Sequence, residues 1–375
     1  MTLNEIDITN YKNISRASLQ FSPKINCLLG ANGMGKSNLL DAIYFLSFCK
    51  SFTGCTDAQA IAKDEDFAMV QARYTRSSTM ATEQLALALQ RSRRKSLKRA
   101  GKEYKRLSQH IGAFPLVLVS PADMDLVNGS GEERRRFMDM VISQTDPVYL
   151  DALIRYGHLL EQRNKMLRDF ADRTPDPALF AAVEVQMEAS ATTICHTRAS
   201  WTQRLSKIFA SYYADIAGDN AETPQLIYNS HLASPDASLA ELFECRRTRD
   251  AALGYTTAGP HRDDIDMQLS AMPLRRCASQ GQAKTYTIAL RLAQYDFLKQ
   301  AAGISPLLLL DDIFDKLDAS RVERIMAVAS RPGFGQIFIT DTNRKHLDEI
   351  LGHSGGQYAM WTVNDGDFTP TMPLS

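Results

Sequence analysis

The sequence lacks several features that mark whole classes of protein. No apolar run approaches the roughly 20 residues that a membrane-spanning helix needs. The first residues carry no basic segment followed by an apolar one, so we expect no secretory signal. Net charge is absent as well, because 43 basic residues balance 43 acidic ones, and only local clusters can therefore indicate a charged partner.

The six cysteines include no C-x-x-C pair, so the sequence indicates neither a zinc site nor a disulfide framework. They are Cys27, Cys49, Cys55, Cys195, Cys245 and Cys277. Such a scatter is typical of reduced, mostly packed thiols, and we therefore expect a cytoplasmic protein. With 375 residues, 44% of them hydrophobic, the chain is long enough for two domains and a substantial core.

What the sequence does contain is a phosphate-binding loop. Residues 30–37 read Gly-Ala-Asn-Gly-Met-Gly-Lys-Ser and fit G-x-x-x-x-G-K-[S/T] at every position. An apolar run before the loop, residues 25–29, predicts a buried strand, and residues 38–46 after it predict a helix. Backbone N–H groups of such a turn close around phosphate oxygens, and the helix N-terminus adds partial positive charge. This context favours a nucleotide site over a plain glycine-rich surface turn.

The predicted site binds ATP and Mg²⁺. Its nucleotide-binding residues are Gly30, Ala31, Asn32, Gly33, Met34, Gly35, Lys36, Ser37 and Asn38. We expect Lys36 to reach the β- and γ-phosphates and the Ser37 hydroxyl to be a ligand of Mg²⁺.

Two acids form the second half of this predicted site. Four leucines at residues 307–310 precede Asp311 and Asp312, which predicts a buried parallel strand ending in carboxylates. In an open α/β sheet that end faces the phosphate loop. We expect Asp311 to hold Mg²⁺ and Asp312 to orient and deprotonate the attacking water, with Lys36 as the other catalytic residue. Because aspartate is one methylene shorter than glutamate, we expect slow turnover that suits a switch.

A serine and a glycine open another predicted helix, residues 283–299. The segment before it reads Ala-Ser-Gln-Gly-Gln and departs at two places from L-S-G-G-Q, the signature of ABC-type ATPases. In that class the signature of one subunit closes over the γ-phosphate held by the other. The residues expected to act in trans are Ser279, Gln280, Gly281 and Gln282.

Two further positions are compared with the same class. Asp318 stands where the class has its D-loop, which crosses the dimer interface. The predicted strand at 336–342 ends without the usual switch histidine, so the γ-phosphate lacks an imidazole contact unless Thr340 or Thr342 replaces it. We expect His346 to lie on a helix surface.

A basic run lies between residues 91 and 106, where nine basic residues stand against one acid, Glu103. Gly101 suggests a turn between two strand-like arms. Such a cluster attracts phosphodiester backbones through counterion release, whereas the alternative is a solvated hairpin edge whose charges block strand association. The candidate DNA-binding residues are Arg91, Arg93, Arg94, Lys95, Lys98, Arg99, Lys102 and Lys105; Arg106 completes the run.

The remaining pattern places a helical block inside the chain. Alternating segments at 6–8, 17–21, 67–74 and 83–90 predict strands, and residues 114–121 predict another. Asp146 and Pro147 are typical of a helix start, and the stretch 178–217, free of glycine and proline, predicts one long helix or two. We therefore expect an α/β P-loop ATPase domain in two parts, 1–124 and 251–375, with an α-helical domain, 125–250, inserted between them.

Taken together, these segments resemble the RecF family, bacterial recombination-repair ATPases of ABC type related to the heads of SMC proteins and Rad50. The specific segments are Gly-Pro-His-Arg-Asp-Asp at 259–264 and the arginine-rich stretch at 133–139. Residues 10–13, 120–127, 162–164, 279–282 and 311–312 also match. The chain departs from the family at 50–53, where an arginine is frequent, and at 315–318, where Ser-Glu-Leu-Asp is frequent.

The resemblance implies an ATP-dependent homodimer that binds double-stranded DNA near single-strand gaps, with a weak DNA-stimulated ATPase. It implies RecR and RecO as partners that help RecA to load. An ATP-hydrolysing subunit of a membrane transporter is the alternative, against which the basic run and the helical insertion count. The residues alone assign no chemical role to His261, Arg262, Asp263 and Asp264, for which a structural ion-pair cluster is one interpretation.

Overall fold

The computed structural model describes residues 1–76, 81–169, 177–218, 222–234, 237–314, 317, 319–331, 333–344, 347 and 358–372. The chain divides into two compact units, the first made of Met1–Asp123, Asp215–Gly218 and Ile288–Ser375, the second of Met124–Ala214 and Asp219–Thr287. The second unit thus lies within the sequence of the first and ends at Thr287, not at residue 250. The reason is strand pairing, since β9 (Pro224–Asn229) pairs with β10 (Asp264–Leu269) beyond the expected boundary.

The first unit contains an antiparallel sheet of six strands in the order β2-β1-β4-β5-β6-β7. Its strands are β1 (Thr2–Tyr11), β2 (Ile14–Gln20), β4 (Phe67–Thr75), β5 (Thr82–Gln90), β6 (Ser96–Arg99) and β7 (Lys102–Glu103). The alternating sequence pattern is reproduced in burial, as Leu85, Leu87 and Leu89 of β5 are buried and Gln90 is exposed. One face of this sheet therefore covers the core of the unit.

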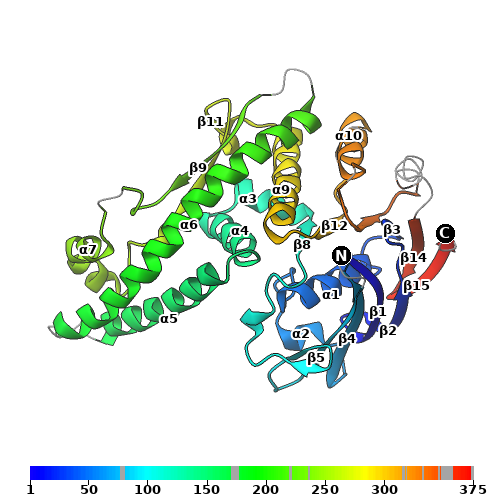
Figure 1. Ribbon diagram of the computed structural model, residues 1–375, viewed down its shortest axis with the longest axis horizontal. Helices are drawn as coiled ribbons and strands as arrows, with labels where there is room; N and C mark the ends of the chain where they lie inside the picture. The colour runs from blue at the N-terminus through cyan, green and yellow to red at the C-terminus, as the bar shows by residue number, and fades with distance from the viewer. Residues whose placement is uncertain are drawn as a thin grey trace. The chain divides into compact units, whose positions relative to one another are not determined.

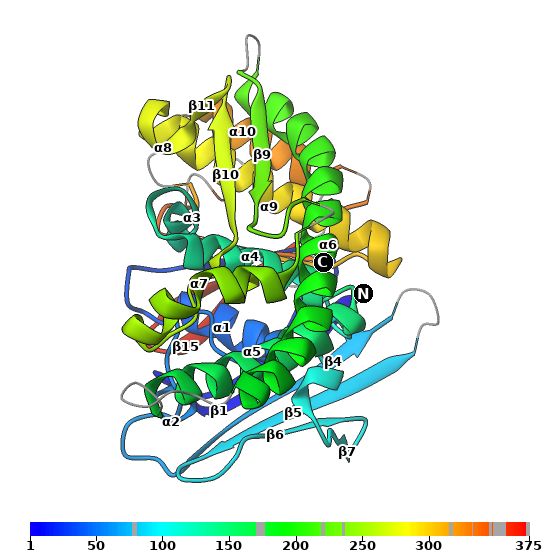
Figure 2. The same ribbon diagram turned by 90° about the vertical axis from the view of Figure 1, so that its left-hand side faces the viewer.

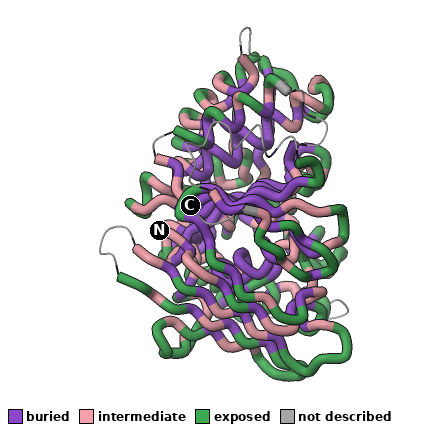
Figure 3. The backbone as a smooth tube through the Cα atoms, turned by 90° about the vertical axis from the view of Figure 1, so that its right-hand side faces the viewer, coloured by how far each residue is buried: buried purple, intermediate pink, exposed green. Residues whose placement is uncertain are grey.

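A second sheet of the first unit carries the phosphate loop, in the order β15-β14-β3-β13-β12-β8. Its strands are β3 (Ile25–Leu29), β8 (Leu116–Val119), β12 (Leu307–Asp311), β13 (Ile337–Asp341), β14 (Tyr358–Asn364) and β15 (Asp367–Met372). All neighbours pair in parallel except β14 and β15. The continuous apolar runs of β12 and β13 are buried along their whole length. Figure 3 shows buried backbone, in purple, gathered in the interior of the molecule.

Helix α1 (Lys36–Phe48) lies between these two sheets. It contacts β1 and β5 of the antiparallel sheet and β8, β12 and β13 of the parallel one (Figure 1). Because nearly all of its side chains are buried, α1 is a rigid core element that begins at the phosphate loop. The short helix α2 (Asp57–Ala60) and helix α10 (Ala319–Ala329) complete this unit together with the later part of α9 (Gln280–Ala302).

The second unit is mostly helical but also holds a small sheet in the order β11-β10-β9, with β11 at Met272–Pro273. Its helices are α3 (Asp125–Asn128), α4 (Gly131–Ser143), α5 (Pro147–Asp169), α6 (Pro177–Ala217), α7 (Leu239–Leu253) and α8 (Leu274–Cys277). Asp146 caps α5 as expected, since its Oδ1 accepts from the Tyr149 N–H at 2.9 Å. Of the two alternatives for 178–217, the structure has one helix of 41 residues, which runs beside β9 (Figure 2).

The structure also shows the character of the helices and the state of the cysteines. None of the described helices combines the length and apolar character that a bilayer crossing requires. The six cysteines are free thiols.

Candidate nucleotide-binding site

The phosphate loop joins β3 to α1, as its sequence pattern predicts, and two of its glycines are there for different reasons. Gly35 has a φ of 108°, a left-handed conformation that strains any other residue, and a Cβ there would lie 2.9 Å from the Asn13 side chain. Gly30 has room for no Cβ, because one would lie 2.4 Å from the carbonyl oxygen of Val363 on β14. The Asn13 side chain and the Val363 backbone therefore pack closely against the two ends of the loop.

Lys36 is buried and bends back over the loop. Its Nζ donates to the carbonyl oxygens of Gly30, at 2.6 Å, and Ala31, at 2.8 Å. Burial lowers the pKa of Lys36, while the nearby carboxylates of Asp312 and Asp311 act in the opposite direction. The ammonium group thus lies within the loop with only weak acceptors, which phosphate oxygens can replace.

Ser37 and Asp311, predicted as metal ligands from distant parts of the chain, lie side by side. The Ser37 hydroxyl donates to Asp311 Oδ1 at 2.8 Å, and the Thr340 hydroxyl donates to the same oxygen at 2.8 Å. Burial raises the pKa of Asp311, with a further contribution from the neighbouring Asp312 carboxylate. A buried carboxylate beside a hydroxyl and a second acid is a set of hard oxygen donors, and Mg²⁺ fits it.

Asp312 follows directly and has a φ of 51°, a left-handed conformation that Asp and Asn tolerate better than most residues. Its backbone N–H donates to Thr340 Oγ1 at 2.9 Å. Thr340 therefore bridges both acids. The sequence suggested Thr340 only as a substitute for the switch histidine, because a hydroxyl shared between strands cannot be inferred from local pattern.

A second polar cluster, which the motif analysis missed, lies along α1. Asp41 is fully buried and accepts from the Tyr11 hydroxyl at 2.7 Å and from Lys12 Nζ at 2.6 Å. Ser51 Oγ and the Phe52 N–H also donate to it. A signal was present, since a carboxylate within an otherwise apolar helix must find partners when buried. The cluster fixes the residues 10–13 turn to α1.

Asn38 adds another contact between the residues 10–13 turn and α1, because its Nδ2 donates to Asn13 Oδ1 at 2.7 Å. Asn13 therefore lies against both Gly35 and Asn38.

The signature segment lies in the second unit and opens α9, which begins at Gln280, three residues earlier than expected. Ser279 and Gln282 form a reciprocal cap: the Ser279 N–H donates to Gln282 Oε1 at 2.8 Å, and the Gln282 N–H donates to Ser279 Oγ at 3.2 Å. Gln282 Nε2 also donates to Glu222 at 2.7 Å. Ser279 is exposed, so its hydroxyl is accessible to a second molecule. Asp318 and His346 lie outside the described residues.

The basic run forms the expected hairpin from β6 and β7, with Ala100 and Gly101 in left-handed conformations at the turn. We call residues 91–106 the basic hairpin. Its cations divide into two groups. Lys95 and Arg99 are partly buried in ion pairs with Asp57, at 2.9 Å, and Glu83, at 2.5 Å. The other candidates are exposed: Arg91, Arg93, Arg94, Lys98, Lys102 and Lys105.

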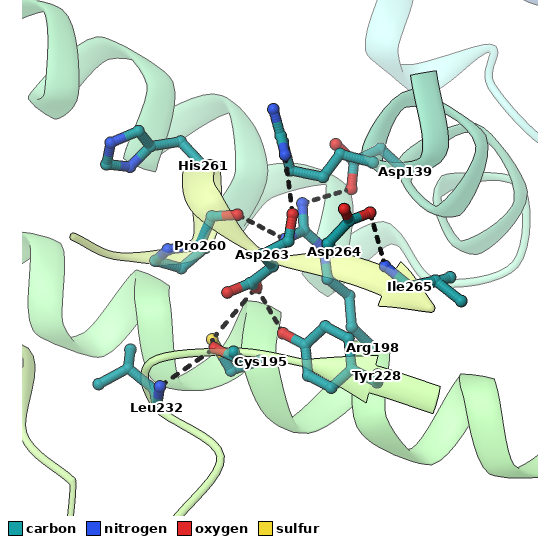
Figure 4. A network of polar contacts seen from close by, with 12 residues as sticks. Asp139, Cys195, Arg198, Tyr228, Leu232, Pro260, His261, Asp263, Asp264 and Ile265 are labelled. Atoms are coloured by element: carbon teal, nitrogen blue, oxygen red, sulfur yellow. Dashed lines mark hydrogen bonds and ion pairs between the residues drawn. The ribbon is translucent and has the colours of Figure 1, made fainter. Parts of the chain in front are cut away.

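Residues 261–264 form an ion-pair cluster within the second unit (Figure 4). Asp263 is buried, and its Oδ2 accepts from Arg198 Nη1 at 2.8 Å and from the Tyr228 hydroxyl. Asp264 accepts two bonds from Arg134, at 2.7 and 2.8 Å. His261 Nδ1 lies 2.9 Å from a tyrosine hydroxyl. The sequence left the role of residues 261–264 open. These contacts support the interpretation that the residues form a structural ion-pair cluster.

The phosphate loop between β3 and α1, the acids that end β12 beside it, and the inserted second unit define the class. It is the P-loop ATPase head of ABC type, an α/β fold with an insertion.

Comparisons with known proteins narrow this class. Residues 2–355 match the RecF/RecN/SMC N terminal domain family. A DNA replication and repair protein RecF from Parabacteroides distasonis is 48% identical over 370 residues, which cover 99% of both chains. A solved structure of the recombination mediator protein RecF-ATPrS in the RecFOR pathway is similar with a TM-score of 0.88 and 25% identity, covering 99% of this chain and 98% of that one.

A more distant likeness concerns the fold alone. An Smc head bound to the C-winged helix domain of ScpA has a TM-score of 0.58 at 15% identity, covering 100% of this chain and 98% of that one. The chain belongs to the RecF family of DNA replication and repair proteins. These comparisons give no support to the transporter alternative.

Proposed function

We propose that this chain is a cytoplasmic, ATP-dependent DNA-binding protein that closes as a homodimer on double-stranded DNA near single-strand gaps and opens on hydrolysis. The observation that carries the proposal is the meeting of Ser37 and Asp311 beside the glycine-rich loop. A RecF-ATP structure with a TM-score of 0.88 to this chain supports ATP as the nucleotide. The RecFOR pathway named for that protein supports RecR and RecO as partners.

At the nucleotide, the residues take distinct roles. Backbone N–H groups of residues 30–35 surround the phosphates, and Lys36 moves from the loop carbonyls to the β- and γ-phosphate oxygens. Ser37 and Asp311 would hold Mg²⁺, and the ion would neutralise phosphate charge. Asp312 orients the attacking water and accepts its proton. Because aspartate is one methylene shorter than glutamate, hydrolysis is slow and acts as a switch, and DNA accelerates it.

The second molecule completes the site with its signature segment. Ser279 is exposed at the N-terminus of α9, where the helix dipole and a hydroxyl that can still donate its proton suit the γ-phosphate held by a partner. Asp318 is proposed as the D-loop residue of the same interface. In this proposal the ATPase domain of one molecule binds the nucleotide, and the second unit of its partner presents the signature segment.

Ser279→Arg tests this composite site. We expect ATP binding by the monomer to stay within about twofold, because the loop is untouched, while ATP-dependent dimerisation is lost through steric and charge conflict at the interface. Sedimentation velocity with and without ATP measures the dimer, and fluorescent-nucleotide titration measures binding. Ser279→Ala, which keeps the small volume, serves as the milder control. Dimers that persist in the Arg variant would contradict a site shared between two molecules.

The exposed cations of the basic hairpin are proposed to contact DNA phosphates. Changing Lys98, Lys102 and Lys105 to Glu should lower duplex affinity by about tenfold or more at moderate salt and flatten its salt dependence, because fewer counterions are released. Fluorescence anisotropy across a salt series measures both. Reversing the three cations Arg246, Arg247 and Arg249 of α7 provides a control of equal charge change. Equal losses from both sets would show only a net-charge effect.

A further inference from the structure

The C-terminal end of α1 is held by the chain that follows the basic hairpin. His110 is fully buried, and its Nε2 lies 2.7 Å from the carbonyl oxygen of Leu46. Because a carbonyl oxygen only accepts, the ring donates from Nε2 and satisfies a carbonyl of the last helical turn, where intrahelical donors run out. One residue further on, Ser47 Oγ donates to the carbonyl oxygen of Phe114. Residues 110–114 are thus fastened to the last turn of α1.

Two cations of the hairpin reach the same place from its inner side. Lys95 Nζ lies 5.1 Å from the centre of the Phe45 ring, in the last turn of α1. The Arg99 guanidinium lies 5.4 Å from the centre of the Phe114 ring, and the His110 ring stacks on the same phenylalanine with centroids 5.6 Å apart. Lys95 and Arg99 of the basic hairpin, together with residues 110–114 that follow it, therefore pack against α1 as one layer.

The other end of α1 is the nucleotide site, since the helix begins with Lys36 and Ser37. Thirteen residues of α-helix span about 20 Å. Along that length Asp41 bonds Tyr11, whose ring meets Phe45 edge-on with centroids 6.3 Å apart. A displacement at one end of such a buried helix cannot be absorbed locally, because well-packed cores are not continuously deformable.

We propose that α1 couples the basic hairpin to the phosphate loop and that His110 is a positioning residue of this coupling. DNA bound to the exposed cations shifts the hairpin, His110 passes the shift to Leu46, and α1 carries it to Lys36 and Ser37. His110 touches neither DNA nor nucleotide. The proposal rests on the proposed function, in which the hairpin binds DNA and the loop binds ATP, and it supplies the route by which DNA stimulates hydrolysis.

The test compares three variants and one control variant of the full-length protein. His110→Phe keeps an aromatic ring against Phe114 but removes the donor to Leu46, whereas His110→Gln keeps an N–H donor. Ser47→Ala removes the neighbouring bond and is the milder substitution. His158→Phe, at an exposed position of α5, is the control for a histidine lost elsewhere. Duplex affinity, ATPase rate without DNA and ATPase rate with saturating duplex are measured for each, with thermal unfolding to verify folding.

We expect His110→Phe to bind duplex and hydrolyse ATP without DNA at wild-type levels, while the DNA-stimulated factor falls by about fivefold or more, the range of ordinary allosteric coupling. His110→Gln should restore stimulation, and Ser47→Ala should reduce it partly. Stimulation retained in both His110→Phe and Ser47→Ala would overturn the proposal, as would a fall in basal rate with an unchanged stimulation factor. Failure of DNA binding by the hairpin is distinguished separately, because its charge-reversal variant would then keep wild-type affinity.

Discussion

Asp312→Asn should leave ATP binding intact and reduce hydrolysis by about 10²–10⁴-fold, the usual contribution of a positioned general base. The structure indicates that this substitution does not disturb the backbone. Asp312 has a left-handed φ of 51°, which Asn also tolerates, and the bond that holds it is made by its backbone N–H to Thr340. Backbone geometry is therefore kept while the proton acceptor is removed. The ATP-bound dimer should accumulate, because in the proposed function the dimer opens only on hydrolysis.

Single-turnover hydrolysis and sedimentation with ATP measure these two effects. Lys36→Ala is the contrast, because it should abolish or nearly abolish nucleotide binding and with it the dimer. Asp312→Ala is the less informative change, since alanine would add backbone strain at a positive φ. An Asn variant with wild-type turnover would assign the proton to another group. Fast steady-state hydrolysis by the wild-type protein with DNA would contradict the expected switch-like behaviour of Asp312.

The parts of the site that could be predicted from sequence are those encoded locally. The glycine pattern of residues 30–37 fixes a loop, and an apolar run ending at Asp311 fixes a buried strand with an acid at its end. Their meeting followed from the general rule that carboxyl ends of parallel strands share one edge. The structure bears out this placement of Ser37 beside Asp311.

What could not be predicted depends on pairing between distant segments. No local pattern in residues 125–250 indicates that β9 pairs with β10, and this pairing extends the second unit beyond residue 250 to Thr287. Thr340 bridges Asp311 and Asp312 only because β13 pairs with β12 in one register. The basic hairpin reads as a uniform charge run, yet Lys95 turns inward because Asp57 is supplied by α2. Each of these facts is a tertiary contact that leaves no periodic trace.

The second large effect concerns stability. Arg198→Met should lower the free energy of unfolding of the second unit by about 3–5 kcal/mol, the cost of leaving a buried carboxylate without its cation. Arg198 is 2% exposed and pairs with Asp263, which is fully buried, and with Asp139, each at 2.8 Å. It also donates to the Tyr149 hydroxyl and to the carbonyl oxygen of Pro260. Methionine keeps much of the volume, so lost pairing dominates over cavity formation.

The two tryptophans of the chain, Trp201 on α6 and Trp361 on β14, make this measurable for one unit. In a Trp361→Phe background, Trp201 fluorescence during urea unfolding reports the second unit alone. Arg136→Met is the matched control, since Arg136 is 57% exposed in its pairs with glutamates and should cost about 0.5 kcal/mol or less.

Adding Asp263→Asn to Arg198→Met should recover part of the loss, because the uncompensated charge is then gone. Recovery would show that the ion pair between Asp263 and Arg198 of α6 stabilises the second unit. If Arg198→Met instead costs no more than Arg136→Met, the buried pairs contribute nothing net, and the stability of the unit comes from apolar packing such as that of Phe209 on Tyr286. The two outcomes differ by several kcal/mol, well beyond the error of a denaturant titration.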